Sequence, residues 1–393
     1  MRMKRRNLFR TIALSALVMT ISLCCFHSGY ENVRLEINDS MLFFHPDSGA
    51  PREPMPLNVT TRFAGNAGRW GILFRVPYRE TGLSAINRTI FTSVLYLTAV
   101  DGSLRALVEK PVVLYKNEGH IRVDIARTPK GIGVAYLARD GRIVCREYDI
   151  HSGLTPVKSY TVPDGGRIVM TDGSLADMAL SYYNGSVYCL AGRKELSILK
   201  AGPDGRVDEF PIVPGHSMKG AVQSGDIHAD GSGIHVLWAE SSGPYGRVER
   251  AFFYHAYFPH GSRQCALTKL KVQGDSANTL KVSFGEKAAG LTVLLQQGNT
   301  LWTADISTTT HRLERMRKLI STGKGKYPSP AMYGCTDGDC YVFFQKINGP
   351  WMYSEKTGLR DGGHIQYRRA VGCKKGECIQ ETSNRGISIM KGL

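Results

Sequence analysis

The stretch DIHADGSGIHVLWAE, residues 226–240, contains the pattern from which the fold of this chain can be predicted. Apolar and polar residues alternate toward both of its ends, and a polar turn rich in Gly and Asp lies between them. Alternation on both sides of a Gly-containing turn predicts two strands joined as a β-hairpin. Within the stretch, Asp226 stands ten residues before Val236.

The same interval recurs earlier in the chain. Asp124 stands ten residues before Val134, and Asp177 stands ten residues before Val187. Each copy has a short strand, a turn with Gly and an apolar second strand, and a third strand usually follows about eleven residues later. A fourth, more polar strand closes each unit. Six units with this outline can be identified, at 70–110, 123–150, 176–202, 226 onward, 281–307 and 331–357.

A repeat of this length, built of alternating strands without a convincing helix, is typical of a β-propeller, because sheets packed around an axis cover one another's faces. We therefore predict an all-β fold, a six-bladed β-propeller of four-stranded antiparallel blades over residues 66–393. Residues 29–65 are expected to form a leading strand (MLFF) and a loop, and the tail GISIMKGL to close the ring. The alternative is a β-sandwich or two small β domains, which would not keep the Asp-to-Val interval constant.

The N-terminus predicts export. The basic segment MRMKRRNLFR precedes TIALSALVMTISLCCF, an apolar run of 16 residues. Because a membrane-spanning helix needs roughly 20 residues, residues 1–28 are predicted to be a cleaved signal peptide, with an uncleaved N-terminal anchor as the alternative. We expect a secreted or cell-surface protein that meets a membrane only through an uncleaved N-terminal segment.

Seven cysteines lie outside this segment, and four of them share one spacing, in CTDGDC (335–340) and CKKGEC (373–378). No histidine accompanies them as a zinc site would require, so local disulfides are predicted and no metal or cofactor is expected. The disulfide candidates are Cys335, Cys340, Cys373 and Cys378. Cys145 and Cys189 lie in adjacent repeats and are candidates for another pair, which would leave Cys265 free. Glycosylation sequons begin at Asn38, Asn58, Asn87 and Asn184, and they would carry sugars in a eukaryotic secretory pathway.

The formal charge of the chain is +16, and about +11 when the five cations of the N-terminal segment are left out. A surface this basic favours acidic partners such as sialylated glycans, sulfated polysaccharides, glycoproteins or anionic lipid headgroups. Nucleic acid is not expected as a partner, because the chain is predicted to be exported and has no basic-aromatic nucleic-acid motif.

Units such as DIHADGSGIHVLWAES followed by AFFYHAYF resemble the repeats of sialidase-superfamily propellers, and the likeness covers about residues 65–390. The segment FRVP (74–77) resembles the F/Y-R-I-P motif on the innermost strand of their first blade. The segment MYGCTDGDCYVFFQ (332–345) resembles the part of their last blade that carries the tyrosine nucleophile.

The resemblance implies a substrate site for the carboxylate of sialic acid. Arg75 would supply a planar guanidinium group, which suits a carboxylate better than an ammonium group does. Lys281 would replace a further arginine in the fifth unit. In the fourth unit Glu240 stands where the family has an arginine, with Arg247 and Arg250 nearby.

The resemblance also implies a catalytic set. Tyr333 would be the nucleophile, because a carboxylate nucleophile would repel the substrate's carboxylate. Asp226 would take the proton of Tyr333, with Glu240 as a substitute, and Asp101 would be the general acid. Asp101 also fits an ordinary Asp-Gly turn, and the shared position of Asp124, Asp177 and Asp226 also fits a structural role.

Departures from the family weigh against catalysis more than against binding. The S-x-D-x-G-x-T-W turn of sialidases is absent from every unit. His228 and His235 are expected as surface or core residues and not as metal ligands. The leading prediction is recognition of an acidic, sialic-acid-type glycan, with hydrolysis by a retaining exo-sialidase-type reaction as its enzymatic form. The alternative is a non-catalytic protein-binding propeller, an adhesin or receptor-like scaffold; a polysaccharide lyase would require a paired tyrosine and histidine that the sequence does not indicate.

Overall fold

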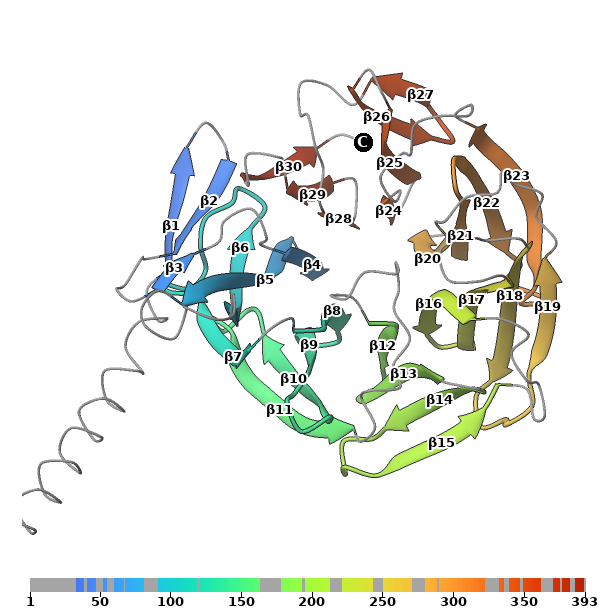
Figure 1. Ribbon diagram of the computed structural model, residues 1–393, viewed down its shortest axis with the longest axis horizontal. Coiled ribbons are helices and arrows are strands. Elements are labelled where there is room, and N and C mark those ends of the chain that lie inside the picture. The colour runs from blue at the N-terminus through green and yellow to red at the C-terminus, as the bar shows by residue number, and fades with distance from the viewer. Residues whose placement is uncertain are drawn as a thin grey trace, which may run out of the picture.

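The structure of the protein, a computed structural model, places its strands in a ring of sheets around one axis (Figure 1). It describes residues 33–38, 41–46, 52–54, 60–66, 68–80, 91–118, 121–162, 178–192, 195–212, 221–242, 250–270, 280–287, 290–321, 332–335, 339–346, 349–361, 370–374, 377–381 and 386–391. The predicted signal or anchor, residues 1–28, lies outside these ranges. Within them, no helix is apolar and long enough to cross a bilayer.

The ring has seven sheets. Blades two to six each consist of four antiparallel strands in chain order from the axis outward. Blade two contains β8 (Val123–Thr128), β9 (Gly131–Leu137), β10 (Ile143–Asp149) and β11 (Thr155–Val162). Blade three contains β12 (Leu180–Tyr183), β13 (Ser186–Gly192), β14 (Leu196–Ala201) and β15 (Val207–Pro211). Blade four contains β16 (Ala221–Ala229), β17 (Gly233–Ser242), β18 (Arg250–Pro259) and β19 (Ala266–Leu270).

The next two blades repeat this order. Blade five contains β20 (Leu280–Lys287), β21 (Gly290–Gln297), β22 (Thr300–Ile306) and β23 (Leu313–Ser321). Blade six contains β24 (Met332–Cys335), β25 (Cys340–Lys346), β26 (Gly349–Ser354) and β27 (Gly358–Asp361). The hairpin predicted from residues 226–240 is β16 paired with β17, in a register that sets Asp226 opposite Leu237.

Blade one differs from the predicted blade. Its strands from the axis outward are β4 (Thr60–Asn66), β5 (Arg69–Glu80), β6 (Phe91–Asp101) and β7 (Val112–Glu118), and β3 (Arg52–Pro54) pairs with the far end of β5. The sequence motif FRVP was expected on the innermost strand. That prediction is wrong, because β4 lies inside β5 and the motif is therefore on the second strand.

Blade seven joins the two ends of the described chain. Its strands are β28 (Ala370–Lys374), β29 (Glu377–Glu381), β30 (Ile387–Lys391), β2 (Met41–Pro46) and β1 (Val33–Asn38), and β2 pairs with β30 through Leu42 and Ile387. The prediction that the tail closes the ring is confirmed. The prediction of six blades is wrong, because the inner and outer strands of the seventh blade come from opposite ends of the sequence. Residues 29–65 accordingly supply strands to blades seven and one.

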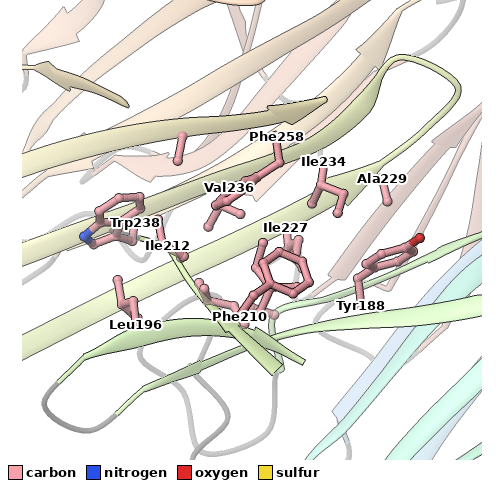
Figure 2. Close-up of a cluster of buried hydrophobic side chains, with 14 of the residues drawn as sticks. Tyr188, Leu196, Phe210, Ile212, Ile227, Ala229, Ile234, Val236, Trp238 and Phe258 are labelled. Carbon is pink, nitrogen blue, oxygen red and sulfur yellow. The ribbon is translucent and has the colours of Figure 1, made fainter. Parts of the chain in front are cut away.

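The apolar core is divided among the seams between blades. The innermost strands β4, β8, β12, β16, β20, β24 and β28 each contact the next one around the ring. Figure 2 shows one seam, where Leu196 and Phe210 of blade three face Val236, Trp238 and Phe258 of blade four. A fully buried side chain of this size contributes about 1.5–3 kcal/mol. Trp238, at the end of the repeat unit, is thus a seam residue.

The cysteines follow the prediction in part. Cys335 and Cys340 form a disulfide across the β24–β25 hairpin, as predicted. Cys378 is also disulfide-bonded, and Cys373 lies opposite it in the register of β28 and β29. The predicted pairing of Cys145 with Cys189 is wrong, because both are free thiols packed in the apolar seam between blades two and three. Buried cysteines often serve as small hydrophobic residues in this way.

Cys265 is free as well, and its thiol donates to the carbonyl of Ile212 over 2.8 Å.

Among the sequons, Asn184 is exposed in the β12–β13 turn, where its φ is 47° and that of Gly185 is 76°. Two left-handed residues at the centre of a two-residue turn are the geometry that closes a tight hairpin. Asn58 and Asn87 lie outside the described residues.

Candidate functional site

Besides Lys287 at the end of β20, four charged side chains of the innermost strands are half-buried near the axis. They come from four different blades: Arg62 from β4, Asp124 from β8, Asp226 from β16 and Lys281 from β20. Of these, the sequence predicted site roles for Asp226 and Lys281. Arg62 was missed, because the repeat pattern did not include β4.

Asp226 is held by backbone amides of two blades. The amide N–H of Ile227 donates to its Oδ1 over 2.9 Å, and the amide N–H of Phe284 on β20 donates to its Oδ2 over 2.8 Å. Burial raises the pKa of Asp226 to about 6, against the opposing effects of these two bonds and of His228 and Lys281. The carboxylate therefore links blade four to blade five.

Small hydroxyl side chains make the same kind of link. The amide N–H of Val282 on β20 donates to Oγ of Ser224 on β16 over 3.2 Å. One seam earlier, the amide N–H of Ala229 on β16 donates to Oγ of Ser181 on β12 over 3.0 Å. A buried amide left unpaired would cost about 1–3 kcal/mol. These side chains on the innermost strands therefore stabilise the ring.

Asp124 occupies the repeat position of Asp226 and makes the corresponding local bond. The amide N–H of Ile125 donates to its Oδ1 over 2.8 Å. Burial raises the pKa of Asp124 to about 8, while that bond and the charge of Arg62 act in the opposite direction. Asp177, the third aspartate at this repeat position, lies outside the described residues.

Arg75 lies on β5, one strand outward from the innermost strand β4, where Thr60 is opposite it in the register. It is buried on β5, and its Nη1 donates to the carbonyl of Ile121 over 3.5 Å, where the chain enters blade two. Burial, together with the nearby charge of Arg62, lowers the pKa of Arg75 to about 10. Arg75 thus lies in the seam between blades one and two.

The remaining candidates are dispersed over several blades. Tyr333 is on β24, the innermost strand of blade six, opposite Val342, and Arg247 lies outside the described residues. Glu240 is buried on β17, where its Oε1 accepts the indole N–H of Trp238 over 2.9 Å. Oδ1 of Asp101, at the end of β6, accepts the amide N–H groups of Ser103 (2.7 Å) and Arg105 (3.0 Å).

The structure therefore brings Asp226 and Lys281 into electrostatic contact and distributes the other predicted residues among blades one, four and six. The roles predicted for these residues in binding and catalysis stay predictions. In the described ranges, no three His, Cys, Asp or Glu side chains are grouped as a metal ion would require.

A second charged group joins blades five and six, and its side chains come from β20, β22, β23 and the β26–β27 turn. Lys287 Nζ lies 3.6 Å from Asp305 and 3.3 Å from Glu355, and Arg317 contacts the same two carboxylates at 3.4 and 2.6 Å. A pocket of about 330 Å³ lies beside it, walled in part by Lys287 and Asp305. The two cations and two carboxylates balance each other, so this group stabilises the seam and leaves no net charge for a ligand.

Histidines form a third polar group, between blades four and five. His228, His235 and His255 lie on β16, β17 and β18, and His311 reaches them from the β22–β23 connection. His235 is a core residue, as the sequence-based interpretation allowed, and His228 is half-buried. His255 and His311 could not be linked to this group from the sequence, since 56 residues separate those two positions in the chain.

Comparison with known proteins finds distant similarities among solved structures. No family model matches the chain, and no curated protein matches it either. Among solved structures it is similar to a puromycin-hydrolyzing peptidase of Mycobacterium tuberculosis, at 12% identity and a TM-score of 0.49, over 86% of this chain and 53% of that one. It is also similar to the β-propeller domain of the Trilobed protease from Pyrococcus furiosus, at 8% identity and a TM-score of 0.46, over 84% and 94% of the two chains.

A third similar structure is the acylaminoacyl peptidase of Pyrococcus horikoshii, at 8% identity and a TM-score of 0.49, over 84% of this chain and 50% of that one. The chain thus spans about half the length of the Mycobacterium and P. horikoshii peptidases. Similarities this distant carry no information about activity. The sheet topology by itself defines the class: a seven-bladed β-propeller of antiparallel blades, with the last blade completed by strands from the N-terminal part of the chain.

Proposed function

We propose that this protein is a non-catalytic propeller that binds an acidic protein partner. The observation that carries the proposal is the engagement of Asp226, whose two carboxylate oxygens each accept a backbone amide, one of them from the next blade. A group used in this way supports the ring and is poorly placed to receive a proton from a nucleophile on another blade.

The positions of Arg75 and Glu240 support the same proposal. Both side chains are buried in seams, one between blades one and two and the other among the aromatic residues of blade four. A carboxylate ligand needs a guanidinium group that it can reach in a bidentate geometry. Arg75, which is buried on the second strand, does not offer such a guanidinium group at the axis.

The outer strands of blades four, five and six offer a contact surface, which we call the basic rim. Three of the four exposed large hydrophobic residues in the described part of the chain are on these strands: Leu267 on β19 (41% exposed), Met316 on β23 (43%) and Leu359 on β27 (41%). Exposed cations accompany them, namely Lys269, Arg315 and Lys318. Figure 1 shows these three strands following one another along the outside of the ring.

Exposed apolar side chains among cations suit a protein partner with acidic residues around an apolar centre, because complementary charge directs the encounter and apolar burial stabilises the complex. Cations on outer strands also prevent sheets from pairing edge to edge. Partner binding and edge protection predict different results when the cations of the basic rim are replaced.

A fluorogenic sialoside assay on the mature protein tests whether the propeller is non-catalytic. We expect no turnover from the wild type. Turnover that disappears in Tyr333→Phe would overturn the non-catalytic proposal and restore the glycosidase reading.

The test of the partner claim is quantitative capture from an extracellular fraction. The variant Arg315→Glu/Lys318→Glu should capture at least tenfold less of the partner than the wild type does. The control variant Lys130→Glu/Lys158→Glu, which changes two exposed cations of blade two, should capture as much as the wild type. If these three proteins captured the partner equally, and Arg315→Gln/Lys318→Gln associated with itself, the cations would only protect the outer strand from pairing with another sheet.

Recognition of an acidic glycan is a second candidate, favoured by two cations, Arg62 and Lys281, on innermost strands. A glycan array would support it if the wild type bound sialosides and Lys281→Gln did not. Binding of this kind would be independent of the basic rim, so the two candidates can be separated with the same set of variants.

A further inference from the structure

Four histidines meet in the seam between blades four and five. His235 is 1% exposed and His255 is 0% exposed, while His228 and His311 are partly exposed at the same end of the seam. The other histidines that the structure describes, His45, His151 and His260, are exposed. Among the described residues, buried imidazoles are therefore confined to this one seam.

The two buried histidines bond to each other. Nδ1 of His235 lies 3.1 Å from Nε2 of His255, and the two rings are stacked with centroids 5.4 Å apart. A bond between two imidazole nitrogens needs one protonated and one unprotonated atom. When both rings are cationic, two N–H groups face each other and the bond is lost.

Blade five takes part through His311. Its ring stacks on Tyr257 of β18 at a centroid distance of 4.1 Å and an interplanar angle of 13°, and it lies 5.8 Å from the ring of His235. The backbone of His311 is left-handed, with φ at 53°. Protonation within the cluster therefore acts directly on the contact between the two blades.

The charged and titratable groups around the pair come from both blades. Asp230 follows β16, pairs with His228 (3.4 Å) and accepts hydrogen bonds from Ser232; it is the carboxylate that favours a proton on His235. His228 and, from blade five, His311 disfavour that proton. Further along β16, Asp226 lies near His228 and near Lys281 of β20, and Phe284 of β20 packs beside the ring of His228 at 6.1 Å.

Burial outweighs the attraction of Asp230. Burial and the charges of His228 and His311 lower the pKa of His235 to about 4, and burial together with His235 and His311 lowers the pKa of His255 to about 3. For Asp230, burial would raise the pKa, but the hydrogen bonds from His228 and Ser232 lower it overall, so this carboxylate stays charged in mild acid. The closed seam thus holds a neutral histidine pair.

We propose that the His235–His255 pair, with His311 stacked across from it, is an acid-sensitive latch whose protonation opens the seam between blades four and five. An exposed histidine has a pKa of about 6.5, so the open seam takes up protons below that pH more readily than the closed seam does. The closed state is therefore favoured above pH 6.5 and is progressively disfavoured as the pH falls toward 4. Two such groups shift the open-to-closed ratio on the order of a thousandfold between pH 7.5 and pH 5.

The test is hydrogen exchange of the mature protein from pH 7.5 to pH 5, corrected for the intrinsic exchange rate. Peptides of β18 and β22 should lose protection on the order of a thousandfold more than peptides of β9 and β10 in blade two. Equal loss in both blades, or no loss specific to β18 and β22, would overturn the proposal.

Variants identify the groups responsible. Glutamine can hydrogen-bond but does not titrate, so His235→Gln/His255→Gln should remove the extra pH dependence of β18 and β22. The single variants, which perturb the seam less, should each reduce it by about thirtyfold. His151→Gln, on the exposed surface of blade two, is the matched control and should behave as the wild type. A double or single variant that retains the full pH dependence would contradict the latch.

Discussion

Polar side chains on the innermost strands show how single residues join neighbouring blades. Asp226 and Ser224 on β16 accept amide N–H groups from β20, and Ser181 on β12 accepts one from β16. In an outer strand these amides would face solvent, but near the axis they are crowded by adjacent blades. Short polar side chains satisfy them without filling the space that the next strand needs.

Asp124 gives a prediction at this scale. Its pKa is about 8 in the folded protein, against about 3.9 in an unfolded chain, so the folded state holds the proton more tightly. Stability is then lost as the pH rises from about 4 to about 8. Asp124→Asn can still accept the amide of Ile125 and carries no charge. Relative to the wild type, its gain in unfolding free energy should be larger at pH 8 than at pH 5, by at most about 1.4 kcal/mol for each pH unit between them.

Urea unfolding of both proteins at the two pH values measures this difference, and comparing variant with wild type cancels the contribution of the histidines. Asp208→Asn, an exposed aspartate on β15, is the control. A stability difference that is the same at pH 5 and pH 8 would show that the charge of Asp124 has no such cost.

At the scale of the element, the blades approach each other closely where one strand carries a glycine. Gly133 on β9 faces the ring of Tyr182 on β12, and the hydroxyl of Tyr182 donates to the carbonyl of Val134 over 3.2 Å. The missing side chain on one strand thus accommodates an aromatic ring on the next. The two seams of blade two combine such local fits, at Gly71 and Gly133, with an apolar cluster of their own.

Gly133→Ala should destabilise the protein by about 1–3 kcal/mol, because the added methyl would lie 2.5 Å from Cζ of a ring that its hydroxyl bond holds in place. The midpoint of chemical denaturation measures the effect. Gly102→Ala is the matched control, since its nearest neighbour would lie at 3.6 Å, and it should change stability by less than about 0.5 kcal/mol. Equal effects of the two substitutions would mean that the seam can relax around Gly133.

For the whole molecule, closure of the ring depends on residues from both ends of the described chain. Leu42 of β2 lies opposite Ile387 of β30, and both are buried with Trp70 of blade one. The cluster connects the last blade to the first. A ring closed in this way leaves no blade with an unpacked face.

Leu42→Ala should therefore cost about 2–5 kcal/mol, as expected for a buried leucine whose surroundings cannot collapse into the space. Thermal or urea unfolding measures it. Leu359→Ala, on the exposed basic rim, should stay within about 0.5 kcal/mol of the wild type. A small effect of Leu42→Ala would indicate that β1 and β2 contribute little to closure.

The local pattern of the sequence was sufficient to predict the all-β class, the hairpin of residues 226–240, the Cys335–Cys340 disulfide and the closing role of the tail. The first three depend on residues that are near one another in the chain or on a pattern that repeats along it, and the closing role of the tail followed from the expectation that the ring is closed. The number of blades did not follow, because it depends on how strands from residues 33–46 pair with a strand at 387–391. The burial of Arg75 and the histidine cluster could not be predicted from the local pattern either, since both depend on which faces of separate blades pack together. Side-chain alternation specifies which residues share a face of a strand, but the partner of that face is set by long-range packing around the ring.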